Sequence, residues 1–109
     1  MKLIVAIVQD EDASRLITQL MSEGYGVTKL ATTGGFLRAG NTTLLVGVED
    51  DKLDGAKTII EKVCKSRKQI TSAPSAVTGT AGVYMPYPVE VTVGGATLFV
   101  LDVEQFQKY

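Results

Sequence analysis

Histidine is absent from this sequence, and cysteine occurs once, as Cys64. A zinc site built on imidazole and thiolate ligands therefore cannot be assembled within one chain. The serine–histidine and cysteine–histidine pairs of many hydrolases are excluded for the same reason, and a single cysteine cannot form an intrachain disulfide. We expect no catalytic residue, no metal and no cofactor.

Long apolar runs and an excess of positive charge are also missing. The first apolar run, Leu3–Val8, turns acidic at Asp10, and no run reaches the roughly 20 residues needed to span a membrane. The formal net charge is −1 and the pI about 5.3, which does not suit a protein that holds long nucleic acids through many lysines and arginines. We expect a cytoplasmic protein with no membrane insertion and no nucleic-acid polymer as partner.

Hydrophobic periodicity predicts the regular elements of a single domain, residues 1–109. Strands are expected at Leu3–Val8, Val27–Thr32 and Thr42–Glu49. The first helix carries its apolar stripe at Ala13, Leu16, Ile17, Leu20 and Met21. The second helix carries its stripe at Leu53, Ala56, Ile59, Ile60, Val63 and Cys64, with the basic residues Lys65, Arg67 and Lys68 at its end.

The last third of the chain predicts a long loop and then a hairpin. Segment 70–88 is rich in Ser, Thr, Ala, Gly and Pro and lacks periodicity, which is typical of a functional or mobile loop. After it, Val89–Val93 and Ala96–Val103 read as two strands joined by a two-residue turn at Gly94 and Gly95. Glu90 and Asp102 would then lie on opposite arms of one hairpin.

This order predicts an α+β fold, a ferredoxin-like βαββαβ sandwich with an extra C-terminal hairpin and both helices on one face. The other face of the sheet is then bare and apolar. A monomer must cover such a face, and self-association is the simplest way to do so.

The glycine-rich segment 32–41 is the first candidate site. Glycines let a backbone approach phosphate oxygens closely, Phe36 and Leu37 could sandwich a base, and Asn41 could read a base edge. A plain hairpin loop, with Phe36 covering the core, explains the same residues.

Other candidates also have simple structural explanations. Segment 70–88 is either a lid or partner-binding arm, or a tolerated insertion. An aromatic such as Phe99 in an apolar strand usually belongs to the core, and Cys64 reads as a small buried hydrophobe. The acidic run Asp10–Asp12 is explained by solvated helix capping, and a catalytic carboxylate pair of Glu90 and Asp102 would need a pocket that the sequence does not indicate.

Three strings together carry a specific resemblance. KLIVAIVQDED (residues 2–12), TKLATTGGFLRAGNTTLLVGVED (28–50) and YPVEVTVGGATLFVLDVEQF (87–106) resemble the PII-like cyclic-di-AMP receptor proteins of Gram-positive bacteria. The resemblance runs over residues 1–109 and weakens in 55–83. It implies a homotrimer of ferredoxin-like subunits that bind cyclic di-AMP in three clefts between neighbours, with the sheets facing inward.

The resemblance also implies which residues contact the ligand: Val27, Thr28, Phe36, Leu37, Asn41, Gly47, Phe99 and Lys108. In this scheme Phe36 and Leu37 pack on adenine and Asn41 hydrogen-bonds to it. Gly47 gives the base room to approach its strand, and Phe99 forms an apolar wall.

The phosphate side of the implied site departs from the family pattern. Thr28 and the backbone of Val27 match positions that contact phosphate or ribose. Gly26, however, stands where the family typically has an arginine that reaches phosphate, and Lys108 stands where it typically has a glutamine that contacts the other base. A lost charged hydrogen bond is worth about 1.5–3 kcal/mol, or one to two orders of magnitude in affinity.

The resulting hypothesis is a non-enzymatic signal-transduction receptor that binds cyclic di-AMP, reorders segment 70–88 and regulates an unknown downstream protein. The first alternative keeps the trimer but senses ATP, ADP or another adenine nucleotide, or serves as a ligand-free scaffold. A ferredoxin-like isomerase or phosphatase is disfavoured by the missing histidine. A single-stranded RNA binder is disfavoured by the acidic pI and the lack of an aromatic RNA-binding string.

Overall fold

The computed structural model describes residues 1–30, 40–73 and 87–109. Its elements are β1 (Lys2–Gln9), α1 (Asp10–Ser22), β2 (Gly26–Lys29), β3 (Asn41–Val48), a 3₁₀ turn (Asp50–Lys52), α2 (Leu53–Cys64), β4 (Arg67–Ala73), β5 (Tyr87–Val93) and β6 (Ala96–Asp102). The predicted helices and the first strands are thus present, although β2 ends at Lys29 and the end of its predicted range lies outside the described residues.

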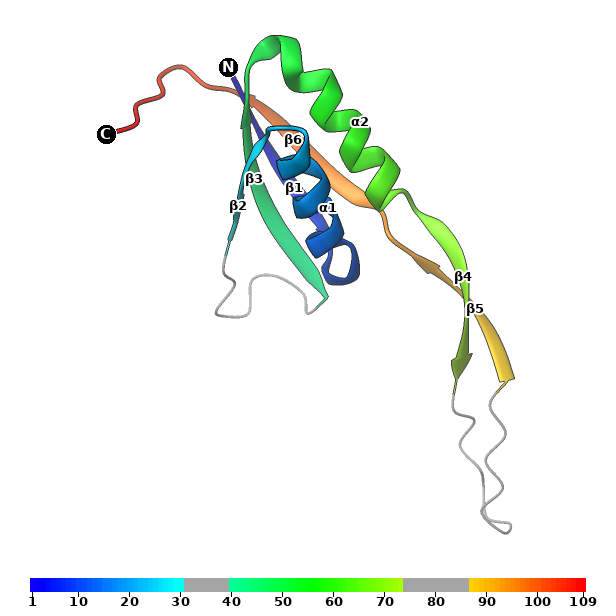
Figure 1. Ribbon diagram of the computed structural model, residues 1–109. Coiled ribbons are helices and arrows are strands. Elements are labelled where there is room, and N and C mark those ends of the chain that lie inside the picture. The colour runs from blue at the N-terminus through cyan, green and yellow to red at the C-terminus, as the bar shows by residue number, and fades with distance from the viewer. Residues whose placement is uncertain (31–39, 74–86) are drawn as a thin grey trace.

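A four-stranded antiparallel sheet forms the body, in the order β2-β3-β1-β6. Helix α1 connects β1 to β2, across β3, while α2 and the β4–β5 segment together connect β3 to β6, across β1. Both helices lie over the same face of the sheet (Figure 1). This α+β arrangement is consistent with a ferredoxin-like fold. Within the described residues the opposite face of the sheet carries no helix, as the sequence predicts.

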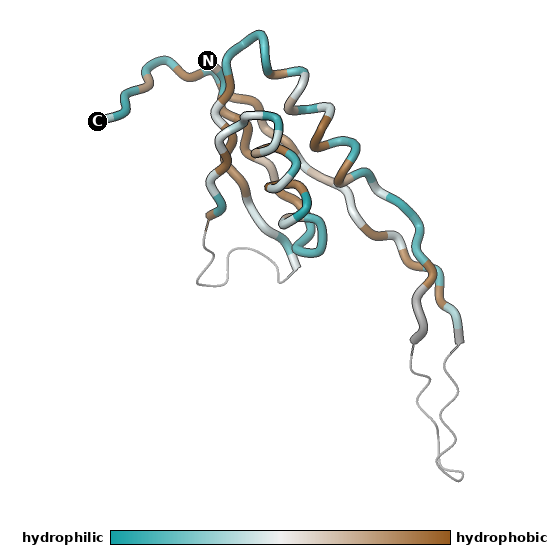
Figure 2. Tube along the Cα trace, viewed as in Figure 1, coloured by the Kyte–Doolittle hydropathy of each residue, from teal (hydrophilic) through white to brown (hydrophobic). Residues whose placement is uncertain are grey.

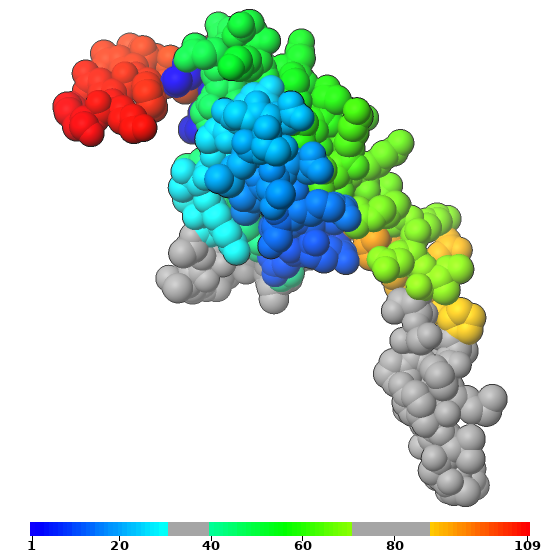
Figure 3. All heavy atoms as spheres, in the orientation of Figure 1, coloured from blue at the N-terminus to red at the C-terminus, as the bar shows by residue number. Residues whose placement is uncertain are grey.

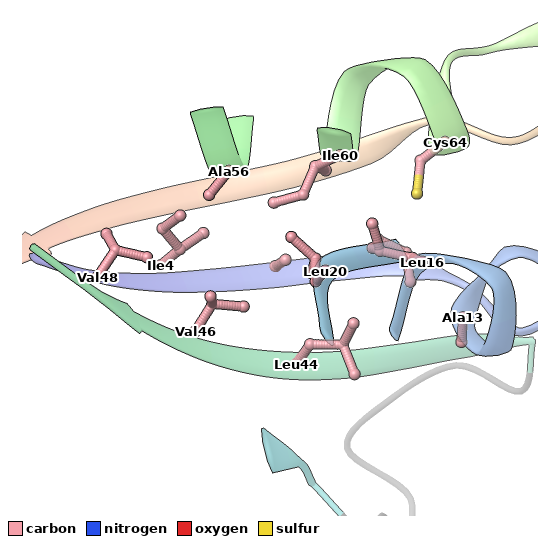
Figure 4. Close-up of a cluster of buried hydrophobic side chains, with 12 residues drawn as sticks. Ile4, Ala13, Leu16, Leu20, Leu44, Val46, Val48, Ala56, Ile60 and Cys64 are labelled. Atoms are coloured by element: carbon pink, nitrogen blue, oxygen red, sulfur yellow. The ribbon is translucent and has the colours of Figure 1, made fainter. Parts of the chain in front are cut away.

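The core lies between that sheet and the two helices. Along β1 every second residue is buried, and these residues meet helix residues spaced three or four apart (Figure 4). Figure 2 shows hydrophobic residues along the strands of the sheet and alternating character along α2. The buried hydrophobic set is Ile4, Ala6, Val8, Ala13, Leu16, Leu20, Leu44, Val46, Val48, Ala56, Ile60 and Cys64. Cys64 is therefore the buried small hydrophobe that its sequence position indicates.

Strands β4 and β5 form a second, two-stranded sheet that projects from the body (Figures 1 and 3). The Cα radius of gyration is 18.6 Å, against about 13 Å for a compact chain of this length. The prediction of an irregular segment 70–88 was wrong at both ends, because Ile70–Ala73 and Tyr87–Pro88 are paired. The sequence of these paired ends shows no amphipathic period, because the ribbon stands away from the core.

The predicted C-terminal hairpin is wrong. β5 pairs with β4, whereas β6 pairs with β1, so the two arms of the expected hairpin lie in different sheets. Gly94 and Gly95 do have positive φ, at 83° and 94°, but they bend the chain from the ribbon into the body. Pairing with β1 places Leu98 against the core.

The same topology separates the two carboxylates that a hairpin would bring together. Glu90 pairs with Lys68 on the ribbon at 3.1 Å, and Asp102 pairs with Lys2 at the end of β6. Arg67 and Lys68 likewise belong to β4 and not to the last turn of α2. The structure therefore gives no paired-carboxylate site at these positions.

Candidate functional site

The helix-free face of the sheet is apolar and open. On β1 this face carries Leu3, Val5 and Ile7, which are only partly buried in the single chain. On β6 it carries Phe99 and Leu101, which are 53% and 49% exposed. Exposed apolar patches of this kind are typical of sites that bind a ligand or another protein surface.

Four of the eight predicted ligand contacts lie on this open face. Thr28, Gly47 and Phe99 are placed there by the pairing register, because residues directly opposite each other in neighbouring strands share a face. Asn41 shares the face as well, at the other end of β3 from Gly47. Phe99 is exposed on this face, so it does not belong to the core of the single chain.

These residues do not form one cluster within the chain. Thr28 lies opposite Leu45, Leu45 opposite Val5 and Val5 opposite Phe99. Three strand spacings of about 4.8 Å separate the two ends of that row, so Thr28 and Phe99 lie roughly 14 Å apart. The described contacts on this face therefore lie on β2 and β3 at one side of the sheet and on β6 at the other.

Beside Thr28 the open face has a patch without side chains. Gly26 on β2 lies directly opposite Gly47 on β3. A Cβ atom built on either glycine would have no neighbour within 4 Å. A flat ring could therefore lie against this backbone, and a longer side chain at position 26 would also have room.

The remaining predicted contacts fall elsewhere. Val27 points toward the helices and packs against the core, so only its backbone is available, as the prediction required. Phe36 and Leu37 lie outside the described residues. Lys108 is exposed in the tail after β6, which leads away from the sheet in Figure 1. The chain does not bring Lys108 to the other contacts.

The base of that tail is held in place. The Val103 N–H donates to the Met1 carbonyl at 3.1 Å, and the Lys2 ammonium donates to the Asp102 carboxylate. The hydrogen bond to this carboxylate raises the pKa of Lys2 above its ordinary value. Beyond the base, Phe106 and Tyr109 are exposed.

At the Asn41 end, the open face leads into a pocket of about 380 Å³. Asn41 pairs with Gln9 across β3 and β1. The side-chain Oε1 of Gln9 accepts a hydrogen bond from the Gly94 N–H at 2.7 Å. The pocket is lined by Ile7, Gln9, Asn41, Gly94, Gly95, Ala96 and Thr97.

Asp12 is a structural residue whose role the sequence analysis missed. It is 1% exposed, and it accepts hydrogen bonds from Arg67 at 2.8 Å and from Arg15 at 3.3 Å. The expectation of a solvated cap is therefore wrong for this residue. The signal was present in the sequence, because Asp12 precedes Leu16 and Leu20 by four and eight residues and so lies on the buried stripe of α1.

Cys64, close to this ion pair, is expected to be chemically inert in the folded protein. Burial raises the pKa of its thiol from 9.0 to about 11, and the Asp12 carboxylate adds to the rise. At pH 8 the thiolate fraction is then lower by roughly a hundredfold, so an aromatic disulfide reagent should react at least that much more slowly than with urea-unfolded protein.

The same pKa sets a stability window. The folded state keeps the Cys64 proton up to about pH 11, whereas the unfolded state releases it near pH 9. This tighter proton binding stabilises the folded state fully below pH 9, and the stabilisation is lost as the pH rises toward 11. Equal rates of reaction of the Cys64 thiol with the disulfide reagent, in folded and in unfolded protein at pH 8, would contradict the raised pKa.

Among residues 1–30, 40–73 and 87–109, no three His, Cys, Asp or Glu side chains converge on a common point that could hold a metal ion. None of the helices in these ranges has the length and apolar character to cross a membrane.

Comparison with known proteins adds two findings. A protein-family model described as "cyclic-di-AMP receptor" matches residues 1–109. A crystal structure of a functionally unknown protein from Pediococcus pentosaceus superposes with a TM-score of 0.78 and 41% sequence identity. That match covers 99% of this chain and 96% of the other.

Proposed function

The chain belongs to the cyclic-di-AMP receptor family, and we propose that it is a non-enzymatic signalling receptor that binds cyclic di-AMP. The family match over the whole chain is the observation that carries the proposal. The geometry agrees with it, since Thr28, Asn41, Gly47 and Phe99 share one open face. We also propose a cytoplasmic location, as the sequence predicts.

The ligand is proposed to bind between subunits of a homotrimer. Thr28 and Gly47 lie near one free edge of the sheet and Phe99 on the other, so a single ligand would meet both sets most simply where the β2 edge of one copy approaches the β6 edge of the next. The exposed apolar face supports association through the sheets. A particle mass near three times 11.6 kDa by light scattering is the expected result, and a monomer at high micromolar concentration would contradict it.

Calorimetric titration of cyclic di-AMP tests the function directly. We expect saturation near one ligand per chain, with ATP and cyclic di-GMP as comparison ligands. Asn41→Ala should weaken binding at least tenfold, because a hydrogen bond to the base is lost where an amide can both donate and accept.

Thr58→Ala is the matched control for this titration. Its hydroxyl is exposed on α2, where it donates to the Asp54 carbonyl, and the affinity should not change. Absence of both heat and thermal stabilisation for the unmodified protein at high micromolar cyclic di-AMP would overturn the proposed function.

An adenine mononucleotide such as ATP or ADP is the alternative ligand. The specific observation in its favour is Gly26, which stands where the family typically has a phosphate-binding arginine and leaves open space beside Thr28. Competition decides between the two, since ATP that displaces labelled cyclic di-AMP at equal or lower concentration would favour the alternative.

Regulation is proposed to pass through segment 70–88 to a downstream protein. Ligand binding can reorder this segment only if the ligand favours one of its conformations. Limited proteolysis with and without cyclic di-AMP should therefore give different cleavage patterns, and identical patterns would contradict the switching step.

A further inference from the structure

The β4–β5 ribbon joins the body at two short connections, and three contacts hold this junction. Arg67 at the start of β4 donates to the buried Asp12 at 2.8 Å. Gly95 N–H donates to the Cys64 carbonyl at the end of α2. Gly94 N–H donates to the Gln9 side chain at 2.7 Å. The ribbon is thus anchored separately to α1, to α2 and to β1.

The junction is tightly packed around Gly94. A Cβ atom at this position would lie 2.6 Å from Nη1 of Arg67 and 2.7 Å from the Lys65 carbonyl oxygen. Its φ of 83° is also one that side chains rarely adopt. Gly94 therefore lies directly against Lys65 and Arg67, where the chain leaves α2 and begins the ribbon.

Of the three anchors, the Gln9 side chain is the one that reaches the open face. Gln9 pairs with the predicted ligand contact Asn41 and lines the same pocket with it. Asp12 and Cys64 are buried on the helix side of the sheet. The Gln9 amide has two different ends. Its oxygen accepts from Gly94, and its nitrogen can donate two further hydrogen bonds.

We propose that Gln9 is a positioning residue that couples the ligand site to the ribbon. Its oxygen holds the Gly94 N–H, and its amide nitrogen donates to a nucleotide acceptor placed beside Asn41. A ligand in this pocket then fixes the amide orientation, strengthens the anchor at Gly94 and restricts the ribbon. The inference rests on the proposed function for the identity of the ligand.

Hydrogen exchange of the full-length protein tests both ends of the amide. The amides of Gly94 and of β4 and β5 are followed with and without cyclic di-AMP, at concentrations well above the dissociation constant measured for each variant. Gln9→Ala removes both ends. Gln9→Glu keeps an oxygen acceptor for Gly94 but removes the nitrogen donor.

Without ligand, Gln9→Ala should speed exchange at Gly94 by about tenfold, the equivalent of one lost hydrogen bond, and Gln9→Glu should restore it to within about twofold of the unmodified rate. With ligand, exchange along the ribbon should slow in the unmodified protein and stay unchanged in both variants. A purely structural role would instead give Gln9→Glu the full ligand response.

The outcomes separate the inference from the proposed function. If cyclic di-AMP binds and Gln9→Ala still shows the unmodified ribbon response, the coupling role is overturned while the receptor function stands. If cyclic di-AMP does not bind at all, the receptor function and the coupling fail together. The Gly94 exchange rates without ligand then still decide whether Gln9 holds the junction.

Discussion

Replacing Asp12 by asparagine is expected to lower the free energy of unfolding by about 3 kcal/mol. Breaking a buried ion pair costs about 3–5 kcal/mol, and the lower value applies here because the side chain of Arg67 is 39% exposed and can still reach water. Asparagine keeps the size of the side chain, so no cavity contributes. It also removes the negative charge that pairs with Arg67 and Arg15, and it replaces one carboxylate oxygen by an amide NH₂ that cannot accept a hydrogen bond from Arg67.

Urea denaturation at one fixed protein concentration measures this loss, since association would make stability depend on concentration. Glu11→Gln is the matched control. It removes the neighbouring charge from the same first turn of α1. The interaction of this exposed charge with the helix dipole stabilises the fold by less than about 1 kcal/mol. An equal loss in both variants would show that the dipole and not the buried ion pair is responsible.

Replacing Gly26 by arginine is expected to raise the affinity for cyclic di-AMP by ten- to a hundredfold. A hydrogen bond to a charged group contributes about 1.5–3 kcal/mol, and each 1.4 kcal/mol corresponds to about a factor of ten. The backbone has room for the change, because a Cβ at Gly26 meets no atom within 4 Å. The new side chain would project from the open face next to Thr28. Thr28 is the residue that the family resemblance implies to contact phosphate or ribose.

Gly26→Met is the control for this gain, since it adds a long side chain without a charge or a donor. We expect its affinity to match or fall below that of the unmodified protein in calorimetric titrations. The gain of the arginine variant should also shrink as salt concentration rises. An arginine variant that binds no more tightly than the methionine variant would mean that position 26 does not face a phosphate.

Part of this architecture follows from local sequence patterns. Burial at every second residue of β1, and at three- and four-residue steps along α1, follows directly from periods of about 2.0 and 3.6 residues. These periods give the layers and the bare apolar face. Missing histidine and a single cysteine exclude whole classes of site from composition alone.

The layout of the candidate contacts could not be predicted from the sequence. Thr28, Gly47 and Phe99 came from a family resemblance, and only the pairing register shows that they share a face, with Thr28 and Phe99 on its two outer strands. The role of Phe99 depended on this register, because an aromatic in an apolar strand packs equally well on either side until its partners are known.

Tertiary structure decided the partners of β5 and β6. Gly94 and Gly95 satisfy the local rule for a tight turn, yet β6 pairs with β1, some 90 residues away, and β5 with β4. Both pairings join β5 and β6 to strands that lie far from the Gly94–Gly95 turn in the sequence, and no local window contains those partners. The same holds for Asp12, since its place on the buried stripe is visible in the sequence but its partner Arg67, 55 residues away, is not.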